Sequence, residues 1–189
     1  MTTATVDAQA AMWNTTETTT DTTGTNAPTA EAPATERTIV HGSFTLERTY
    51  PHAPAKVFAA WADRDRKSRW FWPDFVTRKD RYELDFRVGG HEHLEGPLGS
   101  GRTFVYDATF ADIVEGRRFV ATYDLHIEGR LISVTLLTVE FVPEGAGTQL
   151  FLTEHAAFVD GLDSLEDRMP GVEEMLDQLD RYMDTVAAA

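Results

Sequence analysis

The chain has 189 residues, a formal net charge of −14 and no cysteine. The lack of cysteine excludes disulfides, thiolate catalysis and zinc–thiolate sites, and it is typical of a cytoplasmic protein. The sequence has no basic stripe to neutralise phosphates and no apolar run long enough to span a bilayer, so we expect neither nucleic acid nor a membrane as a partner.

Residues 1–36 differ in composition from the rest of the chain. They contain 13 threonines and five acidic residues, but neither lysine nor arginine. So few large apolar side chains cannot offset the entropy lost on ordering, and the segment is predicted to be a disordered acidic tail. A signal peptide is not expected, because a basic start and an apolar core are both missing. Residues 37–189 are predicted to form one domain.

Removal of the predicted tail, residues 1–36, should leave the melting temperature nearly unchanged, because the segment has almost nothing to bury. Thermal unfolding of the full and the shortened chain, followed by circular dichroism, measures this directly. A clear drop in the shortened chain would mean that the tail docks on the domain, with Trp13 as the first residue to test.

The domain begins with strand and short-helix patterns. Alternation of apolar and polar residues predicts a first strand over residues 43–50. Pro54 suits the first turn of a short helix over 54–63, and a second short helix is predicted over 64–70. Further strands are predicted over residues 82–88, 91–94, 102–113, 118–127, 131–142 and 148–156, joined by short turns that contain glycine.

One long helix is predicted at the end of the chain, over residues 170–186. Pro170 is assigned to its first turn, and acidic residues occupy one face. The opposite face carries an apolar stripe at helical spacing, made of Val172, Met175, Leu176, Leu179, Tyr182, Met183 and Val186. Such a stripe needs a broad apolar partner, which the preceding strands can supply.

This order of elements predicts an α+β fold of the helix-grip type. Short turns between consecutive strands imply antiparallel pairing. We therefore expect a curved antiparallel sheet of about six or seven strands, wrapped on the long C-terminal helix, with two short helices after the first strand. A cavity is expected between the sheet and the final helix.

The order of motifs resembles the START-like, or SRPBCC, superfamily. Within it the chain is similar to the bacterial proteins that are like the heat-shock-protein-ninety ATPase activator homologue, which are also polyketide cyclase-like. The matching motifs are Arg48 with Pro54, Val57, Phe58 and Trp61, then Trp70, Asp85-Phe86-Arg87-Val88-Gly89-Gly90, Tyr106-Asp107-Ala108, Tyr123-Asp124-Leu125-His126, Thr153-Glu154 and Ala157-Phe158-Val159-Asp160-Gly161.

The resemblance implies that a small, apolar molecule binds between the sheet and the long helix. Two alternatives stay open at this point. The same cavity can house an enzyme of the cyclase or hydrolase kind, or the domain can bind a chaperone or regulator through its acidic helix face. The chaperone-activating role belongs to relatives that have a further co-chaperone domain, and the threonine-rich tail does not look like one. A monomer or a homodimer fits the sequence equally well.

Candidate cavity residues are chosen by their place in the predicted strands and helices. Tyr106 and Tyr123 lie in mainly apolar rows, so their hydroxyls can serve as polar groups of a pocket. His126 and Glu154 are titratable groups near them that can act as acid or base. The full set that we expect to line the cavity is Trp70, Tyr106, Ala108, Ala121, Tyr123, His126, Glu154, Leu176 and Leu179. No residue is assigned a catalytic role.

The segment His91-Glu92-His93 is considered as a metal site. In a strand, His91, His93 and Glu95 point to one side, and two histidines with a carboxylate can hold iron or zinc. This spacing is common on solvated strands, and nothing in the sequence fixes a further ligand. We therefore expect no metal and no cofactor. Arg87 is expected to pair locally with Asp85.

Overall fold

The computed structural model describes residues 37–71 and 81–187. Its elements in chain order are β1 (Ile39–Tyr50), α2 (Pro54–Ala62), α3 (Arg64–Lys67), β2 (Arg81–Leu84), β3 (His91–Pro97), β4 (Thr103–Val114), β5 (Arg118–Ile127), β6 (Arg130–Glu144), β7 (Gly147–Val159) and α4 (Leu165–Ala187). The predicted tail, residues 1–36, lies outside the described residues. None of the helices in the described ranges is both long and apolar enough to cross a membrane.

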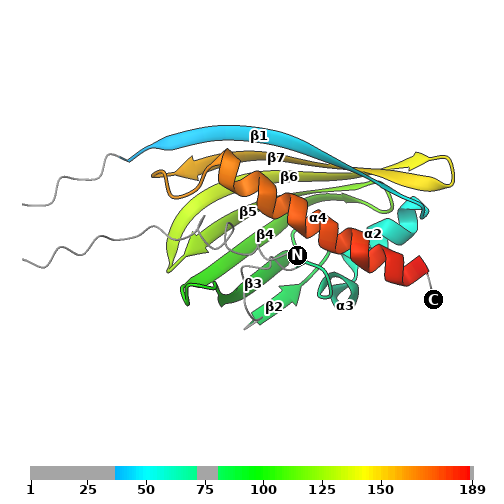
Figure 1. The fold of residues 1–189 in the computed structure, drawn as a ribbon, viewed down its shortest axis with the longest axis horizontal. Coiled ribbons are helices and arrows are strands. Elements are labelled where there is room, and N and C mark those ends of the chain that lie inside the picture. Colours follow the sequence, from blue (N-terminus) through cyan, green and yellow to red (C-terminus); the bar gives the residue numbers. More distant parts are fainter. Residues whose placement is uncertain (1–36, 72–80, 188–189) are drawn as a thin grey trace, which may run out of the picture.

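The seven strands form one antiparallel sheet in the order β1-β7-β6-β5-β4-β3-β2. Strands β2 to β7 follow one another across the sheet in chain order, and β1 joins the edge beside β7. Figure 1 shows the sheet curving around α4, which crosses its concave face, with α2 and α3 at one end. The predicted α+β helix-grip fold, with two short helices after the first strand, is confirmed.

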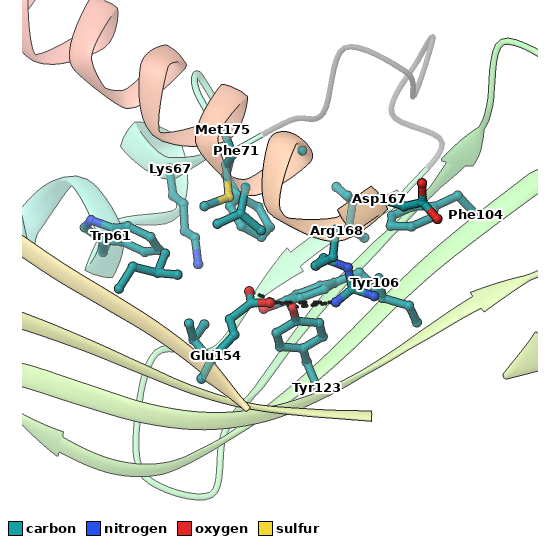
Figure 2. A pocket seen from close by; sticks show the side chains of 16 residues that line it. Trp61, Lys67, Phe71, Phe104, Tyr106, Tyr123, Glu154, Asp167, Arg168 and Met175 are labelled. Atoms are coloured by element: carbon teal, nitrogen blue, oxygen red, sulfur yellow. Dashed lines mark hydrogen bonds and ion pairs between the residues drawn. The ribbon is translucent and has the colours of Figure 1, made fainter. Parts of the chain in front are cut away.

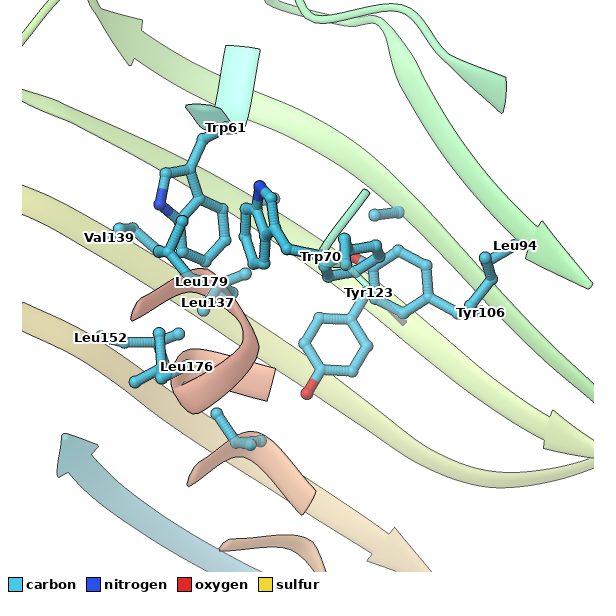
Figure 3. Close-up of a cluster of buried hydrophobic side chains, with 14 of the residues drawn as sticks. Trp61, Trp70, Leu94, Tyr106, Tyr123, Leu137, Val139, Leu152, Leu176 and Leu179 are labelled. Atoms are coloured by element: carbon cyan, nitrogen blue, oxygen red, sulfur yellow. The ribbon is translucent and has the colours of Figure 1, made fainter. Parts of the chain in front are cut away.

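The core fills the space between the sheet and α4. On β4 the alternation is regular, so Phe104, Tyr106, Ala108 and Phe110 are all buried on the same face. Figure 3 shows where the layers meet: the two indole rings of Trp61 and Trp70 lie beside apolar side chains of the sheet and of α4. The labelled partners in this part of the core are Leu137, Val139, Leu152, Leu176 and Leu179.

The short helices form where the sequence predicts them. Pro54 occupies the first turn of α2, and Val57, Phe58 and Trp61 are buried. The α3 helix is shorter than predicted, since it ends at Lys67 and turns follow. Its start is fixed by Asp63, whose side chain accepts a hydrogen bond from the backbone N–H of Arg66 at 2.9 Å.

The long helix α4 begins at Leu165, not at Pro170. Ser164 caps it: the Ser164 hydroxyl accepts from the backbone N–H of Asp167 at 3.2 Å and donates to the Asp167 carboxylate at 2.7 Å. Pro170 therefore lies inside the helix, where its missing N–H removes one backbone hydrogen bond. The predicted start at Pro170 was wrong because this capping sequence outweighs the preference of proline for the first turn. Because the helix begins earlier than predicted, it includes Asp167 and Arg168.

The Asp85–Gly90 turn ends β2 earlier than predicted. Arg87 Nε lies 2.8 Å from an oxygen of Asp85, which confirms the expected local pair. Gly89 has φ +76°, a conformation that favours glycine. A Cβ on Gly90 would lie 2.1 Å from the carbonyl oxygen of Asp85, so the turn has no room for a side chain there.

Candidate functional site

A cavity of about 90 Å³ lies between the concave face of the sheet and the N-terminal half of α4. The residues around it come from α2, α3, the segment after α3, five strands and α4 (Figure 2). They are Trp61, Lys67, Phe71, Leu94, Phe104, Tyr106, Tyr123, Leu125, Leu137, Leu152, Glu154, Asp167, Arg168, Gly171, Val172 and Met175. The lining is therefore mainly apolar and aromatic, with a few charged groups.

One cluster of polar groups lies on the sheet side of the cavity, against the first turn of α4. The Tyr123 hydroxyl donates to Glu154 Oε1 at 2.7 Å and accepts from Arg168 Nη1 at 2.9 Å. The Arg168 side chain also donates to Asp163 and Ser133. Figure 2 shows Glu154, Tyr123 and Arg168 converging from β7, β5 and α4. These groups are all buried, so their hydrogen bonds replace contacts with water.

A second buried polar cluster lies where α3 meets the sheet. Lys67 Nζ donates to Glu92 Oε2 at 2.7 Å, and the Tyr82 hydroxyl donates to Glu92 Oε1 at 2.9 Å. The Lys67 ammonium also lies 4.2 Å from the ring centroid of Phe71 and 5.2 Å from that of Trp61. One carboxylate and two aromatic rings thus stabilise the charge of Lys67.

Burial shifts the pKa of several groups around the cavity. Burial raises the pKa of the Glu154 carboxyl, although the charge of Arg168 and the hydrogen bond from Tyr123 oppose this. Burial lowers the pKa of Lys67, and Glu92 opposes that shift. The pKa of Tyr123 is raised, chiefly by burial and by the charge of Glu154. In each of the three groups, burial therefore favours the neutral form over the charged one.

The structure brings three of the nine predicted site residues together at the cavity, namely Tyr106, Tyr123 and Glu154. The rings of Tyr106 and Tyr123 pack against each other at a tilt of 41°, with centroids 5.0 Å apart. The Tyr106 hydroxyl lies 3.4 Å from Glu92 Oε2, so it approaches the second polar cluster rather than the first.

The other predicted residues lie elsewhere. Ala108, Ala121, Leu176 and Leu179 are buried in the core but do not line the cavity. Trp70 is also a core residue: its indole N–H donates to the carbonyl oxygen of Ala60 at 3.1 Å, and its ring packs edge-on against Trp61.

His126 alternates along β5 with the buried Leu125 and Ile127, and it is opposite Val105 of β4. Its side chain therefore points to the other face of the sheet and does not reach the cavity.

Lys67, Glu92 and Arg168 were missed by the sequence analysis. Glu92 could have been found, because it shares a strand face with Leu94, whereas its neighbours His91 and His93 alternate with it. Arg168 could also have been found, because it precedes Val172 by four residues and so lies on the apolar stripe of α4. No local pattern identifies Lys67, which ends the charged run Arg64-Asp65-Arg66-Lys67.

The histidines of β3 lie on its outer side. The His91 ring bonds to the Thr109 hydroxyl at 3.1 Å, and His93 Nδ1 lies 2.5 Å from an oxygen of Asp107. His93 Nε2 is also 3.7 Å from Glu95. Across the described ranges, no group of three histidine, aspartate or glutamate side chains is arranged to hold a metal ion.

The fold and this cavity define a helix-grip protein with charged groups buried beneath its C-terminal helix. The chain belongs to the family described as Activator of Hsp90 ATPase homolog 1-like protein, whose profile matches residues 51–184. The resemblance to this family and to the START-like superfamily, inferred from the order of motifs, is thereby confirmed. Comparison with curated proteins gives no significant match.

Solved structures of similar proteins agree with this assignment. The Mll3558 protein from Rhizobium loti is 40% identical, with a TM-score of 0.70 over 77% of this chain and 99% of that one. A putative uncharacterized protein from Rhizobium leguminosarum is 32% identical, with a TM-score of 0.72 over 79% and 98% of the two chains. CalU16 from Micromonospora echinospora, 23% identical with a TM-score of 0.54 over 78% and 85%, shares the fold.

Proposed function

We propose that this protein binds a small, largely apolar molecule in the cavity between the sheet and α4. The observation that supports the proposal is the lining itself, which combines aromatic and aliphatic side chains with a few buried polar groups that converge on one side. Empty cavities in protein cores are typically apolar, whereas this one is bordered by the charged groups of Glu154, Arg168 and Lys67. Membership of a START-like family supports the same function.

The volume of the cavity limits the size of a ligand that can bind without movement of the lining side chains. A volume of about 90 Å³ is smaller than the roughly 150 Å³ cavity that takes up benzene in an engineered protein. A larger ligand needs a side chain of the lining to move, and Met175 is the most adaptable one because its side chain is unbranched and flexible. Met175 is half-buried on α4, so such a movement does not require unpacking of the helix.

Substitution of Val172 by phenylalanine should reduce binding of the neutral apolar dye N-phenylnaphthylamine at least about tenfold, a loss of about 1.4 kcal/mol. Val172 is buried and lines the cavity, so the larger ring occupies the space that the dye needs. Dye fluorescence measures the affinity, and circular dichroism checks that the variant is folded.

The matched control is Val142→Phe, the same change at an exposed position of β6, which should leave dye binding unchanged. Amide chemical-shift changes in the unmodified protein give a second measurement that does not depend on any variant. Equal dye binding by both variants, with shift changes far from the lining residues, would place the binding site elsewhere and contradict the proposal.

A second candidate function, acid–base catalysis in the same cavity, is favoured by one observation. Glu154 is a buried carboxyl with a raised pKa, and a tyrosine hydroxyl and a guanidinium lie close to it. General acids and bases in enzymes commonly have such surroundings. The two functions are told apart by mass spectrometry of a bound ligand after incubation, because a binder releases its ligand unchanged whereas an enzyme does not.

A further inference from the structure

One carboxylate oxygen of the first polar cluster has no hydrogen-bond partner. The Glu154 side chain is only 4% exposed and points into the cavity from β7 (Figure 2). Its Oε1 atom accepts from the Tyr123 hydroxyl, but Oε2 accepts no hydrogen bond from any described residue. Among the described residues, the nearest cationic atom is Arg168 Nη1 at 3.8 Å, beyond hydrogen-bond distance. A buried acceptor of this kind is costly unless something donates to it.

The guanidinium of Arg168 cannot supply that donor without giving up another bond. Its Nη2 donates to Asp163 and, at 2.6 Å, to the Ser133 hydroxyl. Its Nη1 donates to the Tyr123 hydroxyl at 2.9 Å and to the Thr135 hydroxyl at 3.5 Å. Each terminal nitrogen has two N–H groups, so all four are occupied. A ligand anion would therefore find no free N–H on these two nitrogens.

The balance of charges around the cavity also disfavours an anionic ligand. Asp163 bonds directly to Arg168, and within the described part of the chain Glu154 has only this same guanidinium, at 3.8 Å, as a counter-ion, so one cation serves two carboxylates. The other buried cation, Lys67, is paired with Glu92. Asp167 also lines the cavity, and its carboxylate accepts a hydrogen bond from the Ser164 hydroxyl. Carboxylates thus outnumber cations around this space, which favours a cationic or neutral donor and opposes an anion.

The aromatic part of the lining suits the same kind of ligand. Trp61, Phe71, Tyr106 and Tyr123 present rings to the cavity, and such rings attract an ammonium group as well as apolar carbon. An amphipathic amine or alcohol can therefore place its carbon skeleton against the rings and its donor against Glu154.

We propose that the polar side of the cavity selects apolar molecules that carry a hydrogen-bond donor, an ammonium or hydroxyl group that bonds to Glu154 Oε2, and that it rejects carboxylates. This selectivity rests on the proposed function, because it requires that a ligand occupies the cavity. The ammonium group is favoured over the hydroxyl, because it also balances the charge of Glu154.

A series of four compounds that share one benzyl group tests the selectivity. Benzylamine, benzyl alcohol, ethylbenzene and phenylacetate differ only in the group placed at the polar side. Their affinities for the full chain are measured by displacement of N-phenylnaphthylamine and by amide chemical shifts. We expect the order benzylamine, benzyl alcohol, ethylbenzene, phenylacetate, with at least about a tenfold difference between the first and the last.

Glu154→Gln tests whether the carboxylate is responsible. The variant keeps the volume but loses the charge, so the preference for benzylamine over ethylbenzene should disappear. Glu173→Gln is the matched control, because Glu173 is an exposed residue of α4, and it should keep the preference.

The results separate the two proposals. If the dye binds in the cavity but phenylacetate binds as tightly as benzylamine, the selectivity is wrong and the proposed function stands. If Glu154→Gln keeps the preference for benzylamine, Glu154 is not the acceptor and the proposal is overturned. If neither the dye nor any of the four compounds shifts the amides around the cavity, the proposed function itself fails. The compound series does not depend on a variant, so it decides the question even where Glu154→Gln does not fold.

Discussion

Replacement of Lys67 by methionine should lower the free energy of unfolding by about 3–5 kcal/mol, although methionine fills much of the same space. Lys67 is 1% exposed, and its ammonium is bonded to Glu92, which is equally buried. The substitution removes one charge of the pair and leaves the carboxylate uncompensated in an apolar environment. Chemical denaturation followed by circular dichroism measures the loss.

Two further variants show whether the loss of stability comes from the unpaired charge of Glu92. Arg66→Met is the matched control, since Arg66 is exposed one residue earlier in α3, and it should change stability by less than about 0.5 kcal/mol. The double variant Lys67→Met with Glu92→Gln removes both charges and keeps an acceptor for the Tyr82 hydroxyl. It should be more stable than Lys67→Met alone. A double variant that loses as much as the two single changes together would mean that packing, not charge, explains the effect.

The sequence predicted the fold well because strand alternation and short turns are local signals. Strands β2 to β7 needed only a period of two and short turns between them, and their antiparallel order followed from those connections, whereas the pairing of β1 with β7 joins distant parts of the chain. Tyr106 and Tyr123 were predicted at the cavity for the same reason, since each lies in an apolar row of its strand. Side chains alternate along a strand, so the neighbouring residues show which face of the sheet a given side chain occupies.

The charged part of the site could not be predicted in the same way. Lys67 ends a run of charged residues that looks exposed, and its burial depends on Glu92, 25 residues further along the chain. Only the folded chain brings the two together. Arg168 was not predicted at the site for another reason. The predicted helix began at Pro170, so Arg168 lay outside it. The capping signal at Ser164 places Arg168 on the buried face of α4.

The alanines of β4 and β5 show the limit of inference from side-chain size. Ala108 and Ala121 were expected to leave room for a ligand, since a small residue in an apolar row does not fill its space. In the structure both are buried beneath larger neighbours, and Ala121 is opposite the fully buried Phe110. In a close-packed core a small side chain leaves room for its larger neighbours, and no local pattern reveals whether any of that room stays empty.

The two halves of α4 have different neighbours. Asp167, Arg168, Val172 and Met175, in the first half, line the cavity. The second half packs on the sheet and carries no residue of the lining: Leu176, Leu179 and Met183 are buried in the core. Substitutions in the second half should therefore affect stability without changing which molecules bind.

Leu176→Ala and Leu179→Ala should each lower the free energy of unfolding by about 2–5 kcal/mol, because truncation removes apolar contacts and leaves a cavity in a packed core. Both side chains are 0% exposed. Denaturant titration measures the loss. Glu173→Ala serves as the control and should stay within about 0.5 kcal/mol. Asp177 is a poorer control despite its exposure, since it bonds to Arg48 of β1 at 2.9 Å.

Dye binding by these variants gives a second, independent result. Leu179→Ala lies beyond the lining, so below the denaturation midpoint it should bind N-phenylnaphthylamine with the affinity of the unmodified chain, in contrast to Val172→Phe. If Leu179→Ala loses stability and dye affinity together, the cavity depends on the packing of the whole helix. If it loses neither, α4 is not held against the sheet by its apolar stripe, and the helix-grip description of this core would have to be abandoned.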